Sequence, residues 1–279
     1  MKTRLITSAV GIIIGVSVVL LSDTIVLPVA VSAIILIILH ELFSANKCTY
    51  SKSITAVCFI FAVFTAFSYF FEILAPYRSV VALLGVFVIF ASYINGHKDI
   101  KFEHIFFMIS STALITYSLC CIIELHSNPL LGKFYIVISL CSAWIADSGA
   151  YFAGTFLGKH KLCPEISPKK TVEGFIGGLL TNGIFMVIIS MVYHKIRFPE
   201  YVDFIVNFDY VKLFILGVIT AVLGTLGDLS ASIIKRQCGI KDYGKIMPGH
   251  GGLLDRFDSV LFVIPFMNLF INMFGIIKI

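Results

Sequence analysis

One aspartate in the C-terminal third of the chain falls inside an apolar segment together with basic residues. Asp228, Ser232 and Lys235 follow one another at i, i+4 and i+7, so a helix would place them on one stripe, with Arg236 beside it. A carboxylate inside a bilayer costs several kcal/mol unless it is paired or binds a cation. Two interpretations follow: a structural Asp228–Lys235 pair, or a metal ligand with phosphate-binding cations close by.

Two more aspartates stand at the start of the next apolar segment. Asp255 and Asp258 are spaced i, i+3 and would share a helical face. They could simply favour the positive end of the helix dipole. Glycines such as Gly251 and Gly252, however, precede them, and a glycine turn into a helix offers backbone N–H groups to an anion. His250 in this turn is, by spacing alone, more typical of a hydrogen-bonded turn residue than of a base. Three aspartates from two neighbouring spans could hold Mg²⁺, which prefers carboxylates plus substrate phosphate oxygens.

A third polar stretch comes earlier, at 167–174. Lys169 and Lys170 beside the start of an apolar segment are natural phosphate binders, although they could also be ordinary cytoplasmic anchors. Thr171 could cap the following helix, with Glu173 as a first-turn acid. Asp147 lies inside a further apolar segment and is a candidate for substrate binding.

The elements that must position these residues are membrane helices. The chain has 279 residues, of which 58% are hydrophobic and only 13% charged, whereas soluble domains are about a quarter charged. Its apolar runs are long and continuous, which excludes the alternation of a β-barrel. We therefore predict an all-α polytopic membrane protein with about nine transmembrane helices. The predicted spans are roughly 4–22, 25–43, 54–75, 79–95, 104–124, 132–157, 172–193, 209–234 and 256–277.

Charge placement predicts the orientation. With the N-terminus in the cytoplasm, most of the 21 lysines and arginines fall on the cytoplasmic side, which favours this topology over nucleic-acid binding. Residues 1–125 are expected to be a transmembrane scaffold and 126–279 a transmembrane catalytic region with a cytoplasm-facing site. The pair His40–Glu41 near the end of the second span is the exception in the scaffold, with either an interfacial or a functional role. The seven cysteines form no C-x-x-C pair and are expected to be small buried residues.

Carboxylates, lysines, arginines and glycine turns at one membrane face are what phosphoryl or nucleotidyl transfer requires, because the catalytic work is positioning and charge neutralisation. The sequence contains no P-loop, G-x-G-x-x-G, H-E-x-x-H or G-x-S-x-G pattern. A nucleophilic serine hydrolase or a zinc hydrolase is therefore not supported. The bilayer location suggests that one substrate is a lipid.

The residues from Ser232 to Asp258 also resemble a known signature. The sequence SIIKR, then KD at 241–242, then PGHGGLLDRFD at 248–258 is similar to the signature of the phosphatidate cytidylyltransferases. Met247 stands where the family usually has Leu, Ile or Phe. The blocks DSGAY at 147–151, where Ser148 replaces the commoner Thr, and SPKKTVEG at 167–174 resemble upstream blocks of the same family.

The resemblance implies that CTP and phosphatidate react to give CDP-diacylglycerol and pyrophosphate. It also implies Mg²⁺ dependence, a multi-pass location in the cell (inner) membrane and a homodimer, with no nucleic-acid partner. Metal ligands would be Asp228, Asp255 and Asp258. Catalytic residues would be Asp228, Asp255, Lys235, Arg236 and His250. Substrate-binding residues would be Lys169, Lys170, Asp147, Ser232, Lys241, Asp242, Gly251, Gly252 and Arg256, although Lys241 and Asp242 could equally form a salt-bridged loop.

Two alternatives remain open on the sequence. A CTP-dependent lipid kinase would use similar metal and nucleotide handling, with His250 or Asp147 as a base near the acceptor hydroxyl. A transporter would use Asp147 and Asp228 as ion sites in broken helices, but the polar clusters gather on one predicted face and no repeat is visible.

Overall fold

The protein is described by a computed structural model that covers residues 2–48, 52–197, 207–249 and 251–278. Its regular structure is almost entirely helical, as the long apolar runs predict. The helices are α1 Lys2–Leu20, α2 Val26–Ala45, α3 Lys52–Phe70, the 3₁₀ helix η1 Glu72–Tyr77, α4 Arg78–Asn95, α5 Phe102–His126, α6 Gly132–Leu157, α7 Val172–Arg197, α8 Tyr210–Gln237, α9 Leu254–Phe257 and α10 Val260–Phe274. The strands are β1 Lys161–Cys163, β2 Ser167–Thr171, β3 Asn207–Phe208 and β4 Ile277–Lys278.

Within the described residues, eight helical segments are long and apolar enough to cross a membrane. They are Val26–Ala45, Lys52–Phe70, Glu72–Asn95, Phe102–His126, Gly132–Leu157, Val172–Arg197, Tyr210–Gln237 and Leu254–Phe274. Helix α1 contributes a shorter apolar stretch, Ile6–Leu20. The predicted all-α, polytopic membrane fold is thus confirmed, while the ninth span and the cytoplasmic N-terminus remain predictions.

The chain forms two compact units, and each contains a piece from the C-terminal end. The first unit comprises Met1–Asn128 and Gln237–Arg256, and the second comprises Pro129–Arg236 and Phe257–Ile279. The polar stretch 237–256 therefore groups with the N-terminal helices, although it follows α8 in the sequence.

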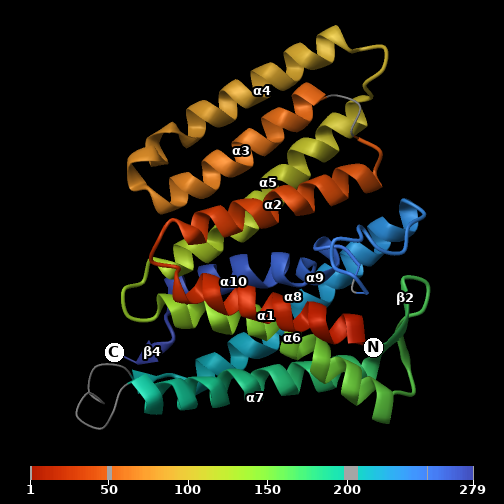
Figure 1. Ribbon diagram of the computed structural model, residues 1–279. Coiled ribbons are helices and arrows are strands. Elements are labelled where there is room, and N and C mark those ends of the chain that lie inside the picture. The colour runs from red at the N-terminus through yellow and green to blue at the C-terminus, as the bar shows by residue number, and fades with distance from the viewer. Residues whose placement is uncertain (1, 49–51, 198–206, 250, 279) are drawn as a thin grey trace. The chain divides into compact units, whose positions relative to one another are not determined.

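In the first unit, α2 lies against α3 and α5, and α3 also lies against α4 (Figure 1). Fully buried aliphatic and aromatic side chains of α2, including Ile35, Leu39 and Phe43, fill the contacts between these helices. Helix α4 is mostly exposed, as expected of a helix that meets lipid rather than protein.

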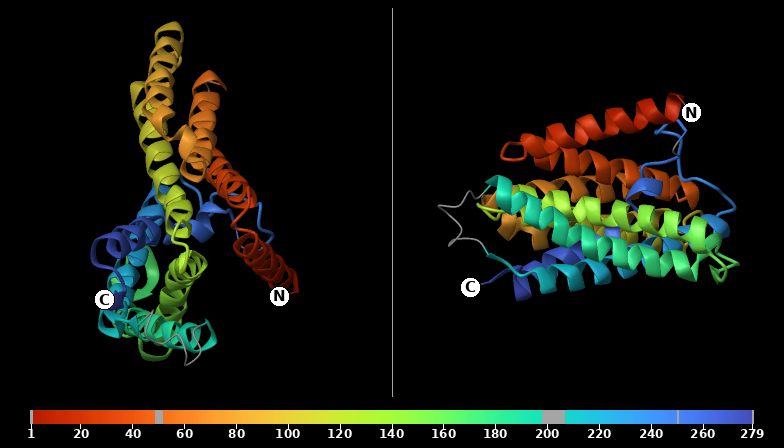
Figure 2. Two further views of the ribbon diagram at one scale, coloured as in Figure 1. Left: turned by 90° about the vertical axis from the view of Figure 1, so that its left-hand side faces the viewer. Right: turned by 90° about the horizontal axis from the view of Figure 1, so that it is seen from below.

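In the second unit, α6 and α7 run side by side along much of their length (Figures 1 and 2), and α10 lies against α6. A buried amide ties three helices together: Asn182 Nδ2 of α7 donates to Ser142 Oγ of α6 at 2.9 Å and to the Gly217 carbonyl of α8 at 2.7 Å. Hydrogen bonds of this kind commonly stabilise the association of membrane helices. They hold α6, α7 and α8 in register, and these helices carry much of the second unit's polar site.

Two short pairs of antiparallel strands add to the helices. Strands β1 and β2 form a hairpin between α6 and α7, pairing Lys161 with Thr171 and Cys163 with Ser167. Strands β3 and β4 pair Asn207 with Lys278 before α8 and after α10. The first hairpin matters for function because it carries the lysines predicted to bind phosphate.

Candidate active site

The central contact in the second unit joins helix α8 to the hairpin. Asp228 and Lys235 both lie on α8, as their spacing predicts. The Lys170 ammonium of β2 pairs with the Asp228 Oδ2 at 2.5 Å. The two side chains are 24% and 27% exposed, so the pair is only partly open to water. The sequence suggested Lys235 as a structural partner for Asp228, which stays a prediction, and the structure adds an ion pair between Asp228 and Lys170.

A buried carboxylate lies close to this pair. Asp258 is only 8% exposed, and the charges of Asp228, Asp147 and Lys235 all act on it. Ser259 joins two of these acids, since its backbone N–H donates to Asp258 Oδ1 at 2.7 Å and its hydroxyl donates to Asp147 Oδ2 at 3.2 Å. Acids from α6, α8 and the segment before α10 thus gather at one place.

Asp255 lies in a helix but Asp258 does not, so the condition under which the two would share a helical face is not met. Helix α9 ends at Phe257, and Asp258 and Ser259 form a turn before α10 begins at Val260. The Asp258 carboxylate bonds to the next N–H, which is the local competition by which Asp favours turns over helix interiors. Asp255 belongs to the first unit and Asp258 to the second.

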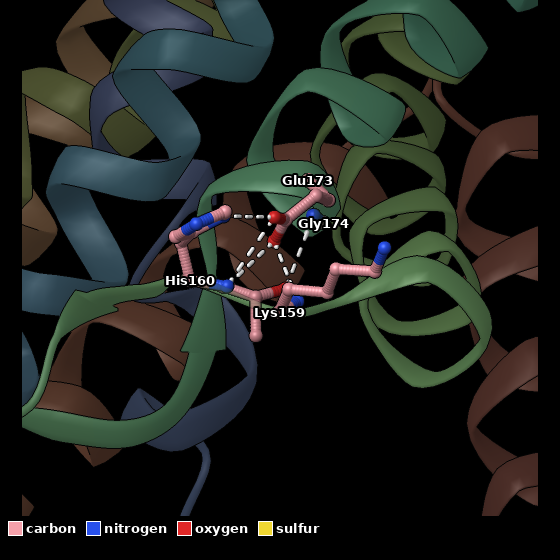
Figure 3. Close-up of polar contacts among 5 residues, drawn as sticks. Lys159, His160, Glu173 and Gly174 are labelled. Atoms are coloured by element: carbon pink, nitrogen blue, oxygen red, sulfur yellow. Dashed lines mark hydrogen bonds and ion pairs between the residues drawn. The ribbon is translucent and has the colours of Figure 1, made fainter.

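The hairpin that carries Lys170 is anchored at both of its ends. Thr171 caps α7 by accepting a bond from the Gly174 N–H at 3.1 Å, as the sequence suggested. Glu173 accepts from the Lys159 N–H at 3.0 Å and from the His160 N–H at 3.2 Å, and its Oε1 lies 2.6 Å from His160 Nδ1 (Figure 3). This first-turn acid therefore closes the base of the hairpin.

Lys169 and Lys170 occupy neighbouring positions of strand β2 and have different surroundings. Lys169 is exposed, whereas Lys170 is half-buried against Asp228. Successive side chains of a strand point to opposite faces, so only one of the two can reach the acid cluster. Within the second unit, Lys170 is accordingly the one of these two lysines that reaches the acid cluster.

The first unit holds the other part of the predicted site. Asp255 Oδ2 accepts bonds from the N–H groups of Tyr243 and Gly252, both at 2.9 Å. Gly251 has φ +85°, a left-handed conformation that glycine adopts without strain, and it lets the chain turn back toward α9. The turn before α9 is thus organised by the first acid of the helix itself.

The N–H groups at the start of α9 do not point to a bare anion site. Those of Leu253 and Leu254 donate to the two carboxylate oxygens of Glu41, at 2.9 and 2.8 Å. Glu41 lies on α2 and is only 3% exposed. The sequence expectation that the glycine turn offers free N–H groups to a substrate anion is therefore wrong for these two. Glu41 was visible in the sequence only as an acid near the end of an apolar span.

A cavity of about 740 Å³ opens beside this turn. Its charged lining contains three cations, Lys241, Lys245 and Arg256, and one acid, Asp242. The remaining lining comes from Gly244, Met247, Pro248, Gly249 and Gly251. A wide, mainly cationic cavity with a glycine-rich wall suits a polyanion such as a nucleoside triphosphate.

The predicted site residues thus divide between the units. The second unit holds Asp147, Lys169, Lys170, Asp228, Ser232, Lys235, Arg236 and Asp258. The first unit holds Lys241, Asp242, Gly251, Gly252, Asp255 and Arg256. His250 lies outside the described residues. That Asp255 joins Asp228 and Asp258 at one metal ion remains a prediction.

The acids of the second unit are the candidate ligands for Mg²⁺. Among the residues that the structure describes, no three His, Cys, Asp or Glu side chains are arranged as a ready metal-binding group. Mg²⁺, however, usually takes only one or two carboxylates and fills its shell with water and substrate phosphate oxygens. Asp228 and Asp258 could supply such a pair, and the crowding of negative charge there favours a cation.

The fold and site together define a class: an all-helical, polytopic membrane protein with carboxylates and lysines gathered for chemistry on phosphate groups. The chain belongs to the cytidylyltransferase family, whose model matches residues 2–274. It is therefore a nucleotidyltransferase.

Curated relatives are similar over most or part of the chain. A phosphatidate cytidylyltransferase of Staphylococcus aureus (strain COL) is 34% identical over 275 residues, covering 96% of this chain and 98% of that protein. One of Bacillus subtilis (strain 168) is 36% identical over 206 residues, covering 74% and 72%. One of Staphylococcus haemolyticus (strain JCSC1435) is 45% identical over 138 residues, covering 50% and 49%.

Proposed function

We propose that this chain transfers the cytidylyl group of CTP to phosphatidate and releases pyrophosphate. The observation that carries the proposal is the cluster of Asp147, Asp228 and Asp258 with Lys170 in a chain of the cytidylyltransferase family. The names of the relatives supply the acceptor, and the membrane fold suits a lipid substrate.

The chemistry needs little proton transfer. A phosphate oxygen of phosphatidate attacks the α-phosphorus of CTP, the bond to the bridging oxygen of the β-phosphate breaks, and pyrophosphate leaves with the electron pair. Because the attacking phosphate is already an anion, no strong general base is needed. The work that remains is to hold the two phosphate-bearing substrates together and to neutralise the charge of their phosphates.

The cations of the chain perform that neutralisation. Lys170 pairs with Asp228, and it can exchange this partner for a phosphate oxygen when a substrate enters. Lys235 acts on the same acid cluster from α8. In the first unit, Lys241, Lys245 and Arg256 line the cavity and would hold further phosphate oxygens.

Mg²⁺ is the proposed cofactor. Asp228 and Asp258 would hold it, with Asp255 as a third predicted ligand. When bound, the ion supplies charge neutralisation on the phosphate oxygens. We further propose a location in the cell membrane, with the site facing the cytoplasm and the enzyme acting as a homodimer.

The test is the release of pyrophosphate by purified enzyme in detergent micelles with CTP and Mg²⁺, with phosphatidate added or withheld. We expect release that depends on phosphatidate and on Mg²⁺. Release of CDP with a lipid acceptor bearing a hydroxyl group, and no pyrophosphate with phosphatidate, would contradict the proposal.

A further inference from the structure

The buried carboxylate of Glu41 contacts the backbone of a turn that is 212 residues away in the sequence. Its two oxygens accept the N–H groups of Leu253 and Leu254 at 2.9 and 2.8 Å, and the side chain is 3% exposed. The surrounding helix α2 is strongly apolar, with a mean hydropathy of 2.4 over its span. A carboxylate in such a helix is costly unless its hydrogen bonds are satisfied, so these contacts must compensate for its burial.

Two glycines, Gly244 and Gly252, lie so close to this carboxylate that a side chain at either position would collide with it. A Cβ at Gly252 would lie 2.6 Å from Glu41 Oε2, and a Cβ at Gly244 would collide with Glu41 Oε1. The three heavy atoms nearest to a methyl group at Gly244 all belong to the Glu41 side chain. Gly244 and Glu41 therefore fit each other, and the polar turn closes directly over the end of α2.

The turn that Glu41 holds leads directly into the candidate site. Gly252 donates to Asp255 Oδ2, so the backbone fixed by Glu41 also fixes the Asp255 carboxylate. Gly244, which precedes this turn in the sequence, and Arg256, which follows it, both line the cationic cavity. Glu41 and Asp255 together bind three consecutive N–H groups, those of residues 252, 253 and 254.

We propose that Glu41 is a positioning residue for nucleotidyl transfer, which sets the backbone of the 252–254 turn and, through it, Asp255 and the wall of the cavity. The proposal rests on the proposed function. Glu41 acts through the turn and not on the substrate, so its loss should lower kcat more than it raises the KM for CTP. A displacement of catalytic groups by about 1 Å can cost roughly a hundredfold in rate.

The experiment compares purified variants in the phosphatidate-dependent pyrophosphate assay, with kcat expressed per folded enzyme from size-exclusion chromatography and thermal unfolding. In Glu41→Gln, an amide NH₂ replaces one acceptor and faces a backbone N–H. We expect kcat to fall roughly 10- to 100-fold with a smaller change in KM. Glu103→Gln makes the same chemical change at an exposed position of α5 and should leave both constants unchanged.

A double-mutant cycle separates positioning from general loss of structure. Gly244→Ala alone should lower kcat, because the methyl group displaces Glu41. In a Glu41→Ala background the same substitution should have little further effect, less than about threefold, because the atoms it would strike are gone.

The outcomes are distinguishable from failure of the proposed function. If wild-type enzyme shows no phosphatidate-dependent turnover, the proposed function fails. If wild-type enzyme is active and folded Glu41→Gln keeps its kcat, or if the two effects simply add in the cycle, the role of Glu41 is overturned. If Glu41→Gln is not recovered folded, Gly244→Ala with an unchanged kcat would overturn it equally.

Discussion

Replacing Lys170 with methionine removes the charge of a cation that the structure pairs with Asp228, while keeping a side chain of similar length. The pair spans 2.5 Å between β2 and α8. In the proposed reaction Lys170 exchanges Asp228 for a phosphate oxygen. Lys170→Met should therefore reduce turnover of CTP much more than it reduces the stability of the fold.

The magnitude follows from the partial burial of the pair. Two unit charges about 4 Å apart attract by about 4 kcal/mol at an effective dielectric constant of about 20. Because the Lys170 and Asp228 side chains are each about a quarter exposed, solvent screens part of this attraction. We therefore assign roughly 2–4 kcal/mol to the interaction of the Lys170 charge with a phosphate oxygen in the transition state. At 1.36 kcal/mol for each factor of ten, kcat/KM for CTP should fall roughly 30- to 1000-fold. Because the Asp228 side chain is about a quarter exposed and Lys235 acts on the same acid cluster, removing Lys170 should cost the fold only about 1–2 kcal/mol, between the values for exposed and buried pairs.

The assay is the initial rate of pyrophosphate release as CTP is varied at saturating phosphatidate, with thermal unfolding measured on the same preparations. Lys161→Met, at an exposed position in β1 of the same hairpin, is the matched control and should keep wild-type rates. The reasoning is refuted if folded Lys170→Met stays within about threefold of wild type in kcat/KM.

Three further predictions concern packing, the hairpin and thiol reactivity. Gly227→Ala would bring a Cβ to 2.5 Å from the Asp258 carbonyl oxygen between α8 and the turn before α10, so the melting temperature should fall by the equivalent of about 1–3 kcal/mol. Glu173→Gln should speed tryptic cleavage within the hairpin, because the acid bonds to the backbone of Lys159 and to His160. Burial, with Cys238 nearby, raises the pKa of the Cys48 thiol to about 11, so iodoacetamide should leave Cys48 unlabelled at pH 7.5, and its labelling should increase with pH.

Each of these has a control in the chain. A methyl group at Gly11 of α1 would meet no atom within 4 Å, so Gly11→Ala should leave the melting temperature unchanged or raise it. Glu165→Gln, at an exposed position of the hairpin, should not change the cleavage rate. Cys163 is half-buried in β1 and should label first. Equal behaviour of a variant and its control would contradict the corresponding prediction.

The helical spans could be predicted from the sequence because backbone N–H and C=O groups in hydrocarbon must be hydrogen-bonded within the segment, so a long apolar run forms a helix. The predicted segment 132–157 coincides with α6, and the others lie within a few residues of the observed helices. The chemistry-bearing residues of the second unit were also visible, since an aspartate in an apolar helix stands out by its cost. Asp147, Asp228 and Asp258 do gather in one place.

Contacts between distant segments could not be predicted. Nothing in the spacing indicates that Glu41 binds the turn at 252–254. Almost every residue has a backbone N–H group, so the sequence does not show which of these groups the carboxylate accepts. The break between α9 and α10 was missed because Leu254, Phe257 and Val260 keep a helical spacing through it, whereas the structure has a turn at Asp258 and Ser259. The choice of Lys170 as a partner of Asp228 depends on how the hairpin folds back, which helical spacing on α8 cannot show.

The most direct test of the central claim follows the α-phosphate of CTP. Membranes or micelles containing the enzyme, phosphatidate and Mg²⁺ are incubated with CTP labelled at the α-phosphate, and the label is partitioned between lipid and water. We expect the label to enter the lipid fraction as CDP-diacylglycerol only when phosphatidate is present, and we expect Asp228→Asn to abolish this transfer. Label that stays in the aqueous phase as CDP, or transfer that survives unchanged in Asp228→Asn, would contradict the claim.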